Sequence, residues 1–94
     1  MIGIKNEKDF RAQRAAYLAL RTKQERAKRS TWSEASIKMS QIGDALVHYS
    51  VTAFEGGEAD YKTASNALPT EYTRDLFITA LIHKGYNVRD LLTQ

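Results

Sequence analysis

Cationic side chains are concentrated in the first thirty residues, and they are the residues of this sequence best suited to bind a partner. This stretch has nine basic and three acidic residues, a net charge of +6, whereas residues 31–94 have five basic and eight acidic residues, a net charge of −3. Such asymmetry suggests either an anionic partner for the first third of the chain or docking of the two parts of the chain on each other, and a solvated helix face is the simpler interpretation. The candidate residues for binding nucleic acid or an acidic protein are Arg11, Arg14, Arg21, Lys23, Arg26, Lys28 and Arg29.

Arginine and lysine contact phosphate groups, and each contact releases counterions, so binding of this kind weakens steeply with salt. Tyr17 and Trp32 are the aromatic residues that could stack on an unpaired base beside those contacts. Each also has a structural interpretation, which we favour. Tyr17 falls on the apolar side of a predicted helix, and Trp32 is placed to pack against Ile37 as a hydrophobic staple.

The composition gives little support for a catalytic site or a metal site. The chain has no cysteine and only two histidines, His48 and His83, on different predicted helices. Nothing local pairs a nucleophile with a base. Asp44 and His48 are four residues apart, but two ligands fall short of a structural metal site. We therefore expect no enzymatic activity, no cofactor and no metal.

A long helix is predicted to carry the basic residues, from about Glu7 to about Arg29. Its apolar face at helical spacing is formed by Phe10, Gln13, Ala16, Tyr17, Leu20, Gln24 and Ala27. Three pairs four residues apart, Glu7–Arg11, Arg21–Glu25 and Glu25–Arg29, are each expected to stabilise the helix by roughly 0.2–0.5 kcal/mol. The prediction is thus a rod with one moderately apolar side and exposed guanidinium groups.

The remaining sequence predicts further helices separated by clear breaks. Thr31 or Ser33 caps a second helix that runs to about Phe54, with an apolar stripe at Ala35, Met39, Ile42, Leu46, Tyr49 and Ala53. After Gly56-Gly57, a third short helix over 58–68 is expected. Thr70 caps a fourth helix that reaches Lys84 before Gly85, and Asn87 caps a last turn over 88–92. The fourth helix is apolar on nearly all sides, which indicates a core or an interface.

No segment alternates with a period of two, so the fold class is all-α, a small bundle of three to four helices with a long basic N-terminal helix. We expect a single helical domain over 1–94, with a basic helix at 1–30, a central helix at 31–55 and C-terminal helices at 58–94. A chain of 94 residues buries a modest core.

These features favour a small non-enzymatic regulatory or adaptor protein, of the style of a bacterial or phage accessory protein, acting through protein–protein interaction. It is expected to self-associate, since a short chain cannot cover apolar faces on several sides by itself. The alternative is a regulator that binds DNA or RNA phosphates through the N-terminal helix. No apolar run suits a bilayer or a signal peptide, and the lack of cysteine fits a reducing compartment, so we expect a cytoplasmic protein without membrane contact.

Overall fold

The computed structural model describes residues 2–27 and 32–93, with only the backbone described for Trp32. Within these residues the chain is all helical and contains no strand, which confirms the all-α part of the predicted fold class, and it forms five helices there where three to four were expected. The chain divides into two compact units, Met1–Leu46 and Val47–Gln94. The second helix begins in the first unit and ends in the second. The expectation of one small bundle over the whole chain stays a prediction.

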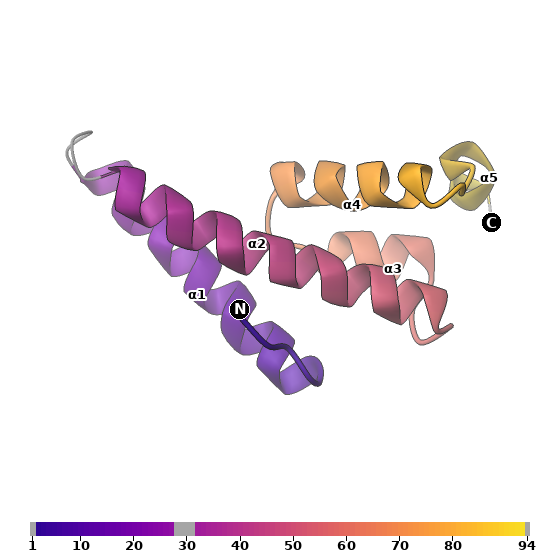
Figure 1. Ribbon diagram of the computed structural model, residues 1–94, viewed down its shortest axis with the longest axis horizontal. Helices are drawn as coiled ribbons and strands as arrows, with labels where there is room; N and C mark the ends of the chain where they lie inside the picture. The colour runs from indigo at the N-terminus through magenta and orange to yellow at the C-terminus, as the bar shows by residue number, and fades with distance from the viewer. Residues whose placement is uncertain (1, 28–31, 94) are drawn as a thin grey trace. The chain divides into compact units, whose positions relative to one another are not determined.

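Helix α1, Glu7–Arg26, is the first labelled helix in Figure 1. It belongs to the first unit. Its start was predicted, but its cap was not. Asn6 is the N-cap, and its side-chain oxygen accepts a hydrogen bond from the Asp9 N–H at 2.9 Å. The helix is described to Arg26, and the predicted extension to Arg29 lies outside the described residues.

The predicted apolar face of α1 is the face that the structure buries. Phe10 and Tyr17 are in the core, with 6% and 5% of their surface exposed, and the other five members of that face are half-buried. The first part of helix α2, Trp32–Glu55, supplies buried Ile42 and Leu46 to the same unit. Gln24 of α1 donates to the Ser36 hydroxyl of α2 at 2.7 Å, so the end of α1 lies beside the start of α2.

The second unit contains the last turns of α2 and the helices α3, Tyr61–Asn66, α4, Glu71–His83, and α5, Val88–Leu92. Phe77 is its central core residue, with 0% exposure. The Phe77 ring stacks on Tyr61 at a centroid distance of 5.9 Å and meets the edge of Phe54 at 6.5 Å. Phe54 in turn contacts Tyr86 at 5.3 Å. Helices α2, α3 and α4 therefore share one aromatic cluster.

Both predicted glycine stops are confirmed by left-handed backbone. Gly57 has φ 75° and Gly85 has φ 95°, a conformation that glycine adopts without strain. After α2, the Glu58 N–H donates to Ala53 O at 2.9 Å and the Gly57 N–H to Phe54 O at 3.2 Å. The same nested pair of bonds closes α4 at Gly85. Each helix thus ends in a Schellman motif, which satisfies carbonyls that the helix itself leaves open.

The expected start of the third helix needed correction, and a side-chain cap is the reason. The third helix was expected from residue 58 but begins at Tyr61, because the Asp60 carboxylate accepts the Thr63 N–H at 2.7 Å and so fixes the N-cap. That backbone hydrogen bond, with a further contribution from the Thr63 side chain, lowers the pKa of Asp60 below its usual 3.8. The predicted caps Thr70 and Asn87 are confirmed.

Candidate functional site

The candidate site is the cationic surface of α1, and the structure divides its predicted residues into three groups. Arg11 and Arg21 are paired with acids one turn away on the same helix. Arg14 is half-buried, and Lys23 and Arg26 are exposed. Lys28 and Arg29 lie outside the described residues, so their predicted contribution stays a prediction, as does the Glu25–Arg29 pair.

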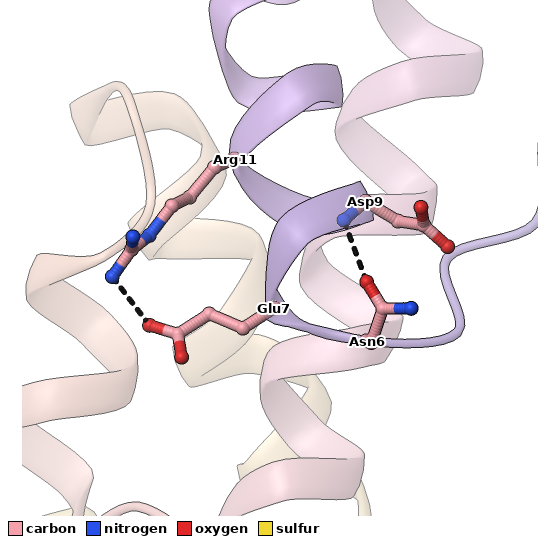
Figure 2. Close-up of polar contacts among 4 residues, drawn as sticks. All are labelled: Asn6, Glu7, Asp9 and Arg11. Atoms are coloured by element: carbon pink, nitrogen blue, oxygen red, sulfur yellow. Dashed lines mark hydrogen bonds and ion pairs between the residues drawn. The ribbon is translucent and has the colours of Figure 1, made fainter.

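The two arginine pairs match the predicted spacing of four residues. An Arg11 Nη2 nitrogen lies 2.9 Å from Glu7 Oε1, beside the Asn6 cap (Figure 2). The Arg21 Nε nitrogen lies 3.7 Å from Glu25 Oε1. All four side chains are more than half exposed, so water screens both pairs and each contributes little to stability. An anionic partner that docked at either arginine would compete with the neighbouring carboxylate.

Lys23 and Arg26 differ from the paired arginines. Neither has an acidic partner among the residues that the structure describes. Both line an open depression of about 600 Å³ on the last two turns of α1, together with Ala19, Thr22 and Ala27. Small side chains between two cations leave room for an approaching anion. Among the predicted cations that the structure describes, Lys23 and Arg26 are therefore the exposed pair that could meet a phosphate or a carboxylate without displacing a neighbouring acid.

The two aromatic candidates have different outcomes. Tyr17 is 5% exposed and lies in the core of the first unit, as the favoured interpretation had it, so its ring is not available to stack on a base in this structure. The side chain of Trp32 lies outside the described residues, which leaves both of its interpretations as predictions.

Large apolar side chains are exposed elsewhere, and the sequence-based list of site residues did not include them. Tyr72 and Ile82 of α4 are 64% and 55% exposed, and Ile37 of α2 and Leu92 of α5 are 62% and 52% exposed. The signal was available for α4, because apolar residues on nearly all sides of a helix indicate a core or an interface. The inner side of α4 is core, with Thr73, Phe77 and Leu81 at 0% exposure, and its outer side presents Tyr72 and Ile82 to solvent.

The titratable side chains in the described part of the chain form no candidate metal site. Within residues 2–27 and 32–93, no three histidine, aspartate or glutamate side chains are grouped so that they could hold a metal ion. Asp44 and His48 are both exposed on α2. None of the helices in the described part of the chain has the length and apolar character needed to cross a bilayer.

No protein-family model, curated protein or solved structure matches this chain. The features of the molecule that bear on its function are therefore the exposed Tyr72 and Ile82 of α4 and the cationic depression of α1.

Proposed function

We propose that this protein is a small non-enzymatic adaptor or regulatory protein that works through protein–protein contacts, associates with itself, and meets an anionic partner with its basic helix. The outer side of α4 carries this proposal. Tyr72 and Ile82 are more than half exposed on one helix, and Leu76 and Ile78 between them are half-buried. Tyr72 and Ile82 stand ten residues apart on this side, about 15 Å along the helix, and offer a partner two apolar contact points.

The size of the chain supports self-association as the first use of that face. A domain of this length buries a smaller share of its surface than a larger one, so covering additional apolar groups by a second subunit stabilises it. Closed dimers are also the commonest oligomers of soluble proteins. We expect the protein to reach about twice the 10.6 kDa of one chain at high concentration.

Light scattering or sedimentation over a range of protein concentrations tests the proposal. Ile82→Glu places a charge on the outer side of α4 and should return the protein to the mass of a single chain. Ile37→Glu is the matched control, since Ile37 is equally exposed but lies on α2, in the first unit. A mass equal to one chain for the unmodified protein at every concentration would rule self-association out.

A second candidate function is nucleic-acid binding. It is favoured by exposed Lys23 and Arg26, which have no acidic partner within residues 2–27 and 32–93. If both side chains contact phosphates, Lys23→Glu/Arg26→Glu should abolish binding of labelled DNA or RNA. The slope of binding against salt concentration for the unmodified protein should then include about two units from these residues. The matched control is Lys62→Glu/Arg89→Glu, which makes the same change in net charge on exposed residues of α3 and α5.

Equal binding by both double variants would mean that α1 has no special part in recognition. A pull-down from lysate with and without nuclease then separates the two candidates, because partners held through nucleic acid are lost after digestion and partners held by protein contact remain.

A further inference from the structure

The open depression at the end of α1 brings two cations together with small uncharged side chains. Ala19, Thr22 and Ala27 line it beside Lys23 and Arg26, and none of these five described residues is acidic. Lys23 and Arg26 are three residues apart, so the helix brings them to neighbouring positions on its surface. A ligand that occupied the volume of about 600 Å³ would therefore meet methyl groups as well as positive charge.

The hydrogen-bond donors of the depression differ in their availability. The Thr22 hydroxyl donates to Leu18 O at 3.1 Å, so its proton is already used within α1. The side chains of Lys23 and Arg26 are exposed and have no acidic partner within residues 2–27 and 32–93. These two cations are therefore the groups of the depression that can bind a carboxylate or a phosphate.

The surface of α1 that continues from the depression toward the N-terminus is uncharged. Ala12, Ala15 and Ala19 follow one another at steps of three and four, and all three are exposed. Lys8 is the next cation in line with Arg26, because eighteen residues make five whole turns, but it lies about 27 Å away along the axis. The phosphates of one DNA strand follow one another at about 3.4 Å along the duplex, so a nucleic acid lying along α1 would pass this stretch without a cation on the same side. This spacing favours a short anionic ligand at the depression over a continuous chain of phosphates.

We propose that the depression binds an acidic segment of a partner protein, in which two carboxylates one helical turn apart meet Lys23 and Arg26 and a neighbouring apolar side chain covers Ala19. This inference rests on the proposed adaptor function and names the chemistry of its anionic partner. Charge complementarity supplies the polar half of the contact, because a guanidinium binds a carboxylate through two parallel N–H bonds and an ammonium binds it as a point charge. The small uncharged side chains supply the apolar half, which a phosphate backbone would leave unused.

An NMR titration of the ¹⁵N-labelled full chain tests the proposal directly. The probe is a synthetic helical peptide with two glutamates four residues apart and a leucine three residues after the second glutamate. The largest amide shifts should fall within residues 19–27, because these residues line the depression. Replacing both glutamates of the peptide with glutamine should weaken binding about tenfold, and replacing the leucine with serine should also weaken it.

Charge reversal on the protein identifies the two cations. Lys23→Glu/Arg26→Glu should weaken binding of the glutamate peptide by about tenfold or more, because two attractions become two repulsions. The same variant should bind a peptide with lysines in place of the glutamates, and this rescue separates a direct contact from a folding defect. Lys62→Glu/Arg89→Glu is the matched control, since it makes the same change in net charge on exposed residues and should keep most of the binding.

The titration has defined outcomes. Shifts within residues 19–27 that require both the glutamates and the leucine, with rescue by the lysine peptide, support the acidic partner segment. No peptide binding up to about 1 mM would overturn it. A short oligothymidine of the same net charge that shifts these residues when the peptide does not would overturn it in favour of nucleic acid. If Lys23→Glu/Arg26→Glu lost the self-association of the unmodified protein, a second copy would be the occupant and the inference would be wrong.

The proposed self-association is tested separately from this inference. Ile82→Glu alters the outer side of α4 and leaves the depression unchanged, so it should keep the peptide binding of the unmodified protein. Failure of the peptide to bind leaves self-association standing. A single-chain mass at every protein concentration rules out self-association and leaves the acidic partner segment standing.

Discussion

Thr70 and Thr73 bond reciprocally at the start of α4, and both are buried. The Thr73 N–H donates to Thr70 Oγ1 at 3.2 Å, the Thr70 N–H donates to Thr73 Oγ1 at 3.1 Å, and the Thr73 hydroxyl donates to Thr70 O at 2.8 Å. A threonine takes the place that glutamate or glutamine usually has in a capping box. The short side chain suits this place because Thr73 faces the core, with 0% exposure, where a longer carboxylate would lose its water.

The cap gives the first prediction. Thr73→Val keeps the shape of the side chain but removes the hydroxyl, which leaves the buried Thr70 N–H without its acceptor. We expect a loss of about 1–3 kcal/mol in the free energy of unfolding, measured by urea denaturation. Thr52→Val is the control: Thr52 is exposed, its hydroxyl donates to His48 O within the helix, and its loss should change stability by less than about 0.5 kcal/mol.

The second prediction concerns the aromatic cluster of the second unit. Phe77→Ala removes the ring that Tyr61 and Phe54 both contact. The lost burial and the remaining cavity should cost about 3–5 kcal/mol, a large part of the stability of a small domain. Leu92→Ala, at a position that is 52% exposed, should change the unfolding midpoint little. Similar losses for the two variants would contradict the central place of Phe77.

Two substitutions of Tyr86 separate the contribution of its ring to stability from that of its hydroxyl. The Tyr86 hydroxyl donates to Glu55 Oε2 at 3.3 Å, a long contact with an exposed carboxylate that Lys84 also meets at 3.2 Å. The ring contacts Phe54 edge to face. Tyr86→Phe should therefore cost less than about 1 kcal/mol, while Tyr86→Ala should cost clearly more. Equal losses in thermal unfolding would assign the stabilisation to the hydroxyl instead.

Asp60 predicts a dependence of stability on pH. Its folded-state pKa lies below the usual 3.8 because the Thr63 N–H bonds to the carboxylate. A lowered folded-state pKa stabilises the protein above pH 3.8, and the stabilisation is lost as the pH falls through the folded value. Asp60→Asn keeps a capping oxygen and does not titrate. The stability of the unmodified protein relative to this variant should fall as the pH drops through 3.8 and on through the lower folded-state pKa. If the difference in stability between the unmodified protein and Asp60→Asn did not change with pH, the charge of Asp60 would have no part in the cap.

Burial predicts the opposite behaviour for Tyr61 at alkaline pH. Loss of water around its hydroxyl raises the pKa of Tyr61 above the usual 10.0. The folded state then holds this proton more tightly than the unfolded state does, so stability should fall as the pH rises above 10.0. Tyr61→Phe has no proton to lose and should remove this part of the alkaline dependence, as measured by thermal unfolding at increasing pH.

Local sequence signals predicted most of the helices. Thr70, Asn87, Gly57 and Gly85 act through bonds to residues within one turn, so their effect does not depend on the rest of the fold. The apolar faces of α1 and of the first part of α2 follow helical periodicity in the same way. Asp60 is an exception, because an acid near two glycines is compatible with either a loop or a helix cap, and local sequence does not choose between them. The third helix was expected three residues before its observed start.

The candidate site depended more on packing. The sequence determined that cations outnumber acids in the first thirty residues and that Glu7 and Glu25 stand one turn from Arg11 and Arg21, since a helix brings such residues together wherever it lies. Helical periodicity already placed Tyr17 on the apolar side of α1. Only the tertiary structure decided that Lys23 and Arg26 line an open depression and that Tyr72 and Ile82 are exposed on α4. The exposure of a side chain depends on neighbours that are distant in sequence. A helix that is apolar on nearly every side therefore does not itself specify which side the core will cover.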